Sequence, residues 1–132
     1  MRALVQTVDG VFAVDLEQEV VLGLEGGMRL EPPPVAQPAR VLPRVVAAAV
    51  SGSTVVAVVE ARPPLMVSHD AGRTWRESGR GLPPGRAVAV AEDNPDLVLY
   101  AARNRLFVSD DGGRFWRALA VELPEIDAVT LA

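Results

Sequence analysis

The stretch SHDAGRTWR at residues 68–76 decides the fold, because it recurs as SDDGGRFWR at residues 109–117, 41 positions further along the chain. The similarity continues on the amino-terminal side, where the apolar pair at 66–67 aligns with the pair at 107–108. A fixed period of about 40 residues is typical of repeat architectures, in which each repeat is one supersecondary unit. The sequence therefore predicts at least two copies of the same unit.

Apolar residues fall in short valine-rich runs bounded by Gly, Pro, Asp or Asn, a pattern typical of β-strands. The clearest unit, residues 86–119, contains four such runs: Arg86–Ala91, Leu97–Ala102, Leu106–Ser109 and Phe115–Leu119. Residues 45–79 repeat this pattern. Four short antiparallel strands in about 40 residues correspond to one blade of a β-propeller. We therefore expect an all-β fold that contains two whole blades.

The two ends of the chain carry complementary parts of a third blade. Residues 2–24 match the second, third and fourth strands of a blade, and their Asp9-Gly10 pair is a hairpin signal. Residues 126–132 align with the first strand of the unit 86–119. The proline-rich residues 25–44 connect the first part to the next blade, either as a stiff spacer or, through the stretch at 31–38, as a docking ligand or lid. We expect one propeller domain with three blade equivalents per chain.

Three blades are too few for a closed ring, since propellers typically have four to eight. We therefore expect a homodimer, in which the carboxy-terminal strand of one chain completes the amino-terminal blade of the other and two chains form six blades. Strand exchange would also cover two sheet edges, and closed cyclic assemblies are the common case. Nine blades from three chains and a pseudo-monomer are the alternatives.

Composition excludes several classes of function. The 132 residues suffice for one domain with its own core, since 49% of them are hydrophobic. A net charge of −4 argues against nucleic-acid binding. The absence of cysteine removes thiolate metal sites and cysteine nucleophiles. The acidic residues at 92–96 and 110–111 do not have the spacing of a known calcium loop, and we expect neither a metal nor another cofactor. No signal-peptide core and no run of about 20 apolar residues is present, which predicts a cytoplasmic protein without a membrane partner.

The repeated stretch resembles the Asp-box, or BNR repeat, of sialidases, sortilin-type receptors and the photosystem II assembly factor of cyanobacteria and chloroplasts. The matching residues are Ser68, Asp70, Gly72, Thr74 and Trp75 in the first copy, and Ser109, Asp111, Gly113 and Trp116 in the second, where Phe115 replaces the threonine. Residues 93–101 are similar to the Asn-Pro…Tyr-Ala segment of these repeats. Residues 14–17 stand where a third box belongs but lack its Gly and Trp.

Physical chemistry gives these residues a structural role. The aspartate can accept hydrogen bonds from turn amides, the glycine can adopt positive φ, and the tryptophan can bury 150–250 Å² against a neighbouring strand or blade. In the family that the motif resembles, the boxes lie on the rim away from the active site. The resemblance therefore predicts the fold and not a reaction.

Catalytic and metal-binding alternatives lack their residues. Sialidase chemistry requires a tyrosine nucleophile with a glutamate partner, but Tyr100, the single tyrosine, lies in a strand where the family repeat uses it for packing. The inner strands carry no acidic pair for a two-carboxylate glycosidase. His69 is the only histidine and cannot anchor a zinc site alone. We therefore expect a protein that is not an enzyme.

Charge placement suggests a ligand face. In a propeller blade, the loops between the second and third strands, and between one blade and the next, open at the same end. The candidate ligand residues at that end are Arg62, Arg80, Arg86, Arg103 and Arg105. Guanidinium groups match carboxylates and phosphates. We expect a binding or scaffold module with a protein or acidic ligand as partner; simple solubilising charge, or a carbohydrate-binding or degenerate glycosidase-like protein, are the alternatives.

Overall fold

The computed structural model describes residues 1–25, 30 and 42–131. They form three four-stranded antiparallel sheets. Blade A has the strand order β12-β1-β2-β3, blade B the order β4-β5-β6-β7, and blade C the order β8-β9-β10-β11. The bounds of the strands are β1 Arg2–Thr7, β2 Gly10–Asp15, β3 Val20–Glu25, β4 Val45–Ser51, β5 Thr54–Val59, β6 Leu65–Ser68, β7 Arg76–Ser78, β8 Ala87–Ala91, β9 Asn94–Ala102, β10 Arg105–Ser109, β11 Arg117–Ala118 and β12 Ile126–Leu131.

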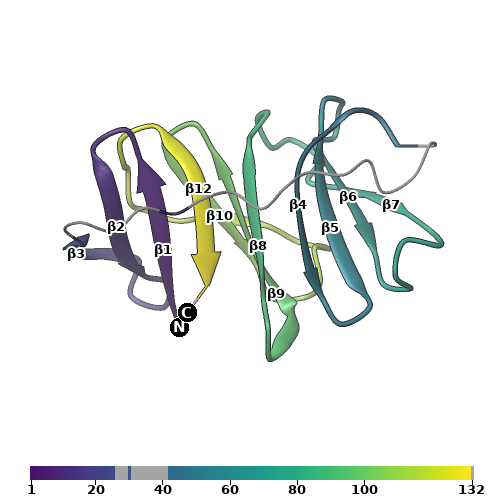
Figure 1. The fold of residues 1–132 in the computed structure, drawn as a ribbon, viewed down its shortest axis with the longest axis horizontal. Helices are drawn as coiled ribbons and strands as arrows, with labels where there is room; N and C mark the ends of the chain where they lie inside the picture. Colours follow the sequence, from purple (N-terminus) through teal and green to yellow (C-terminus); the bar gives the residue numbers. More distant parts are fainter. Residues whose placement is uncertain (26–29, 31–41, 132) are drawn as a thin grey trace.

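These sheets confirm the predicted all-β fold with three blades per chain. They stand side by side with blade C in the middle, so the order in space is A, C, B (Figure 1). The proline-rich stretch predicted as a connector or lid lies mostly outside the described residues. No helix in the described ranges is long and apolar enough to cross a membrane.

The predicted exchange of the last strand between two chains is wrong in this structure. β12 pairs with β1 of the same chain, with Ala3 opposite Leu131 and Val5 opposite Val129. The segment that leads from β11 to β12 bonds to blade C, because Leu123 and Ile126 donate backbone N–H groups to the carbonyls of Asn104 and Arg103. β12 therefore enters the sheet packed directly against blade C, and no second chain is needed to complete blade A.

Blade C is buried on both faces, which explains its almost continuous apolar strands. All five residues of β8 are buried. Ala87 and Ala89 pack in the cluster shared with blade A, whereas Val88 and Val90 pack in the cluster shared with blade B. The alternation follows from the two-residue period of a strand. The main cores of the molecule are thus the two interfaces between neighbouring blades.

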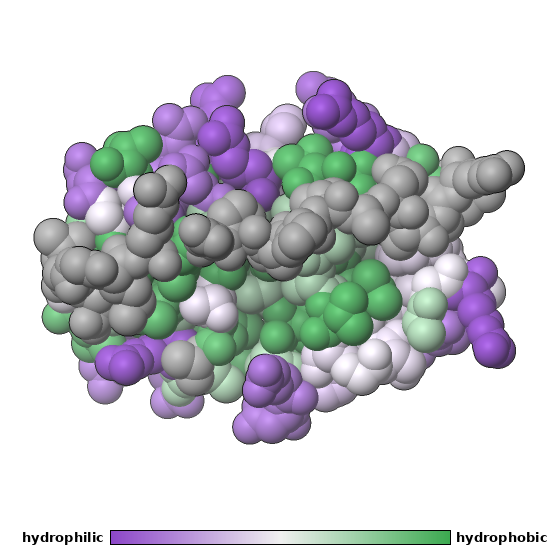
Figure 2. Space-filling view, viewed as in Figure 1, coloured by the Kyte–Doolittle hydropathy of each residue, from purple (hydrophilic) through white to green (hydrophobic). Residues whose placement is uncertain are grey.

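The two ends of the blades differ in character. At the loop end lie the β1–β2, β5–β6, β7–β8, β9–β10 and β11–β12 connections, and at the box end lie the repeated turns at 68–75 and 109–116. Hydrophilic residues gather toward the upper and lower ends of the molecule, with apolar residues in between (Figure 2). The box end is at the bottom of Figure 1, where the amino terminus lies.

Candidate functional site

The first repeated turn is held by the side chains of Ser68 and Asp70. The Ser68 hydroxyl accepts the Gly72 N–H at 2.8 Å and donates to Asp70 Oδ1 at 2.7 Å. Asp70 also accepts the backbone N–H of Thr74 at 2.8 Å and its hydroxyl at 2.6 Å. These hydrogen bonds, above all that from the Thr74 hydroxyl, hold the pKa of the Asp70 carboxyl well below its usual range. Gly72 has φ +90°, which favours glycine.

The second turn repeats this network. Ser109 donates to Asp111 Oδ1 at 2.8 Å and accepts the Gly113 N–H at 2.9 Å. Asp111 accepts the backbone N–H groups of Phe115 at 3.0 Å and Arg114 at 3.1 Å, and chiefly the bond from Phe115 lowers the pKa of this carboxyl. Because the aspartate engages residues so far along the turn, β11 begins at Arg117 and not at Phe115 as predicted, and β7 begins at the equivalent Arg76.

The tryptophans of the two turns differ in their surroundings. Trp116 Nε1 reaches across to blade B and donates to the hydroxyl of Ser78 at 3.0 Å, and to the carbonyl of Gly113 at 3.2 Å. Its ring also meets Tyr100 edge-on, with the ring centroids 6.2 Å apart. Trp75 packs on the face of blade B that points away from blade C. Within the described residues, its Nε1 is buried and has no hydrogen-bond partner.

Blade A retains part of the same turn. Asp15 Oδ1 accepts the backbone N–H groups of Glu17 and Gln18, both at 2.9 Å. Glu19 then reaches blade C, where its carboxylate accepts the Ala120 N–H at 3.0 Å and lies 3.3 Å from the Arg117 guanidinium. No motif in the sequence marks Glu19, so this contact was not predicted.

The five candidate arginines all lie at the loop end, but the structure divides them. Arg86 pairs with Asp127 at 3.3 Å. Arg105 lies 3.5 Å from Glu122 and also donates to the carbonyl of Leu119 at 3.2 Å. Arg62, Arg80 and Arg103 have no ion-pair partner among the described residues. The charges available to a ligand are therefore those of these last three arginines.

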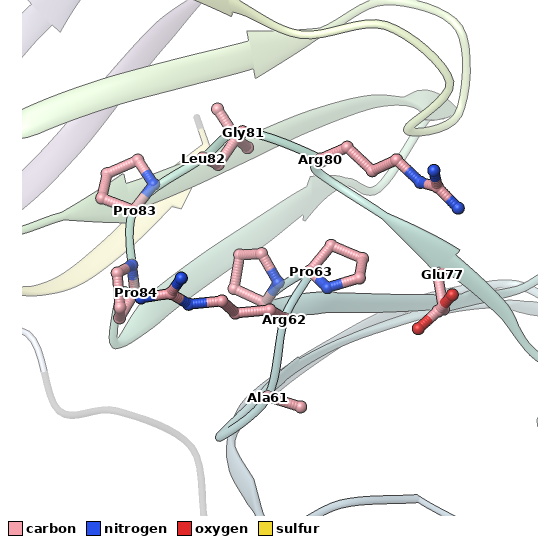
Figure 3. Close-up of a pocket in the computed structure, with 10 residues that line it drawn as sticks. Ala61, Arg62, Pro63, Glu77, Arg80, Gly81, Leu82, Pro83 and Pro84 are labelled. Atoms are coloured by element: carbon pink, nitrogen blue, oxygen red, sulfur yellow. The ribbon is translucent and has the colours of Figure 1, made fainter.

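Arg62 and Arg80 line one cleft of about 600 Å³ between the β5–β6 and β7–β8 connections. Its other lining residues are Ala61, Pro63, Pro64, Glu77, Gly81, Leu82, Pro83 and Pro84. The Arg62 side chain extends toward Pro84, whereas Arg80 and Glu77 lie at the opposite end of the view (Figure 3). Proline fixes its own φ, so two proline pairs give this cleft stiff walls. The two arginines were predicted from the sequence, but their place in one cleft with the proline pairs and Glu77 was not.

The residues weighed for catalysis and metal binding have structural surroundings. Tyr100 is fully buried, its hydroxyl donates to the carbonyl of Pro83 at 2.7 Å, and burial raises the pKa of this hydroxyl above its usual value. His69 is exposed in the first turn, with Nδ1 3.3 Å from the Thr54 hydroxyl. In the described ranges, no group of three or more His, Cys, Asp or Glu side chains could hold a metal ion.

Comparison with known proteins places this architecture among the β-propellers. No protein-family model and no curated protein matches the sequence. Among solved structures, the chain is similar to the GH74 enzyme of Niastella koreensis, with 20% identity and a TM-score of 0.51 over 93% of this chain and 18% of that one. It is also similar to YCF48 bound to D1 peptide, with 18% identity and a TM-score of 0.52 over 95% of this chain and 39% of that one. The chain thus spans well under half the length of these two propeller proteins, and at this identity the likeness concerns the fold alone.

Proposed function

We propose that this protein is a non-catalytic propeller module that binds an acidic peptide segment in the loop-end cleft, with Arg62 and Arg80 contacting its carboxylates. The observation that carries the proposal is that these two arginines, without an ion-pair partner among the described residues, line the same cleft. We interpret the repeated turns as Asp-boxes with a structural role, since their aspartates are used within the turns.

The chemistry of the cleft favours a peptide over other anions. Guanidinium groups form strong, directional hydrogen bonds with carboxylates. Glu77 in the same lining can accept backbone N–H groups of a peptide, which a small inorganic anion does not offer. The volume of about 600 Å³ suits a short segment, and stiff proline walls reduce the entropy lost on binding. That the similar propeller YCF48 is solved with a peptide supports this class of ligand.

The carbohydrate alternative has less support in the lining of the cleft. Neither arginine-bearing connection contributes an aromatic side chain that could stack on a sugar ring. Tyr100, the single tyrosine, is buried and donates its hydroxyl to the carbonyl of Pro83, so it does not offer the nucleophile that sialidase chemistry requires. The proposed function is therefore that of a binding or scaffold module. The proposed assembly is a homodimer, because the three blades formed by the described residues leave two blade faces without a neighbouring blade.

Fluorescence anisotropy with a fluorescein-labelled hexaglutamate peptide tests the ligand, with hexaglutamine as the uncharged control. We expect salt-sensitive binding of hexaglutamate only. Replacing both arginines, in Arg62→Ala/Arg80→Ala, is expected to weaken it about a hundredfold, at about 1.4 kcal/mol for each lost charge-assisted contact. The matched control Arg73→Ala/Arg114→Ala removes two exposed arginines from the box end and leaves the affinity unchanged.

Two outcomes would reject the peptide. One is hexaglutamate binding that the Arg62/Arg80 double variant leaves intact, since the cleft would then not be the site. The other is binding of hexagalacturonate without binding of hexaglutamate, which would favour the carbohydrate alternative.

A further inference from the structure

Both contacts between neighbouring blades follow one rule at the box end. The turn between the third and fourth strands of one blade contacts the fourth strand, or the residues just after it, of the preceding blade. Trp116 of blade C bonds to Ser78 at the end of β7 in blade B. Glu19 of blade A bonds to Arg117 of β11 and to Ala120 of blade C. The blades are therefore stacked with one polarity, from B through C to A.

The same rule leaves two unlike ends. Blade B presents its repeated turn, with Trp75, on the face away from blade C, where the described residues provide no preceding blade. Blade A presents β3, its fourth strand, with no following turn among the described residues. Trp75 corresponds to Trp116, 41 residues on, but its buried Nε1 lacks the cross-blade partner that Trp116 finds in Ser78.

Exposed apolar side chains gather at both ends of the stack. On β3, Val20 is 41% and Leu22 53% exposed. On blade B, Val50 is 64% exposed and follows Ala48 by two residues, so it lies on the face away from blade C. Part of each end is covered by the chain itself: Leu42 packs near Val45 on blade B, and the Leu30 N–H bonds to Gln6 on blade A.

We infer that a second copy of this chain continues the stack, with β3 of each copy contacting the Trp75 turn and the Val50 face of the other. Two copies then form a six-bladed ring with two identical contacts. Six is the one multiple of three within the usual range of four to eight blades. The contact would repeat the two interfaces already present between blades. This inference rests on the proposed homodimer and names the surfaces that form it.

Light scattering coupled to size exclusion tests the inference on the full chain. The wild type is expected at twice the chain mass of 14.0 kDa. Leu22→Asp and Val50→Asp each place a charge in both contacts of the ring, and each is expected to yield monomer. Val8→Asp is the matched control, because Val8 is as exposed as Val50, at 64%, but lies in the β1–β2 turn at the loop end. It should remain a dimer.

Mixing the two monomeric variants gives the sharpest test. One of the two contacts in a mixed dimer combines the unaltered β3 of the Val50→Asp chain with the unaltered blade B of the Leu22→Asp chain. We therefore expect the mixture to recover dimer, which contacts between like ends could not explain. Three results would each overturn the inference. The wild type could be a monomer, Leu22→Asp and Val50→Asp could remain dimers like the control, or the mixture of the two variants could fail to recover dimer.

Hexaglutamate binding on the same samples separates this inference from the proposed ligand. Both substituted side chains are more than half exposed, so circular dichroism should show folded variants. Monomers that still bind hexaglutamate support the ring contact and the cleft independently. A wild type that is a dimer but does not bind hexaglutamate would reject the proposed ligand and leave the proposed contact between copies standing.

Discussion

Replacing Gly85 by alanine should be among the most damaging single-methyl additions in this chain. Gly85 follows Pro84 of the cleft and lies just before the start of β8 at Ala87. A Cβ atom built there would lie 2.5 Å from the Tyr100 hydroxyl oxygen, 2.6 Å from Tyr100 Cζ, and still closer to the carbonyl oxygen of Ala101. Neither neighbour can yield easily, because Ala101 is backbone of a central strand and Tyr100 is fully buried and bonded to Pro83.

The expected cost follows from these contacts. Forcing one methyl group into a packed site costs about 1–3 kcal/mol, and a backbone neighbour places Gly85→Ala near the upper value. Displacing Tyr100 from Pro83 adds about 1 kcal/mol. For a domain of this size, a total of about 4 kcal/mol lowers Tm by roughly 15 °C. The hydroxyl is only part of the obstacle, so the double variant Gly85→Ala/Tyr100→Phe should recover little of this loss.

Differential scanning calorimetry, with urea unfolding followed by circular dichroism, measures both quantities. Gly81→Ala is the matched control, since it changes the same connection where no atom lies within 4 Å of the added Cβ. Its φ of +84° still imposes strain of about 1 kcal/mol. If Gly85→Ala were no more destabilising than Gly81→Ala, the close packing of the cleft wall on Tyr100 would be refuted.

The turns and the B–C interface give three further predictions. Because hydrogen bonds lower the pKa of Asp70 in the folded protein, their stabilisation is complete above the unfolded pKa of about 4 and is lost as pH falls through the folded value. Asp70→Asn should therefore unfold more easily at pH 7 and show a smaller fall in Tm between pH 5 and pH 2; parallel Tm curves would contradict this. Trp116→Phe loses the Nε1 bonds to Ser78 and Gly113 and should lower the unfolding free energy in urea by about 1–2 kcal/mol. Phe115→Ala, in a side chain that is 79% exposed, should change it by less than about 0.5 kcal/mol.

The repeat carried most of the fold prediction, because each aspartate turn belongs to one blade. Residues 68–76 and 109–117 located blades B and C, and the spacing of 41 residues assigned the last strand to a blade that lacked one. The sequence could not show which chain that strand completes, since the ladder between β1 and β12 has the same hydrogen bonds within one chain or between two. In the fold, β12 stays with its own chain, because Leu123 of the short connection from β11 bonds to Asn104 and Ile126 at the start of β12 bonds to Arg103.

The sequence predicted which arginines lie at the loop end, but not which of them form ion pairs within the chain. Topology placed all five arginines at the loop end. Whether each is free depends on side chains from distant segments, such as Asp127 for Arg86, 41 residues away, and Glu122 for Arg105. The cleft likewise forms where the β5–β6 and β7–β8 connections meet, so the sequence of either connection alone does not predict it. Glu19 was missed for the same reason, as its partners belong to another blade.

The pairing of β1 with β12 has a consequence for biosynthesis. In blade A, β1 leaves the ribosome first and its partner β12 leaves last. Until β12 has been synthesised, this sheet therefore lacks its first strand. Blades B and C, each made of contiguous sequence, can form earlier. Such a long sequence separation slows folding, and β1 then exposes an unpaired edge that neighbouring nascent chains could capture. The amino-terminal segment is thus the part of this protein for which chaperone protection during synthesis would matter most.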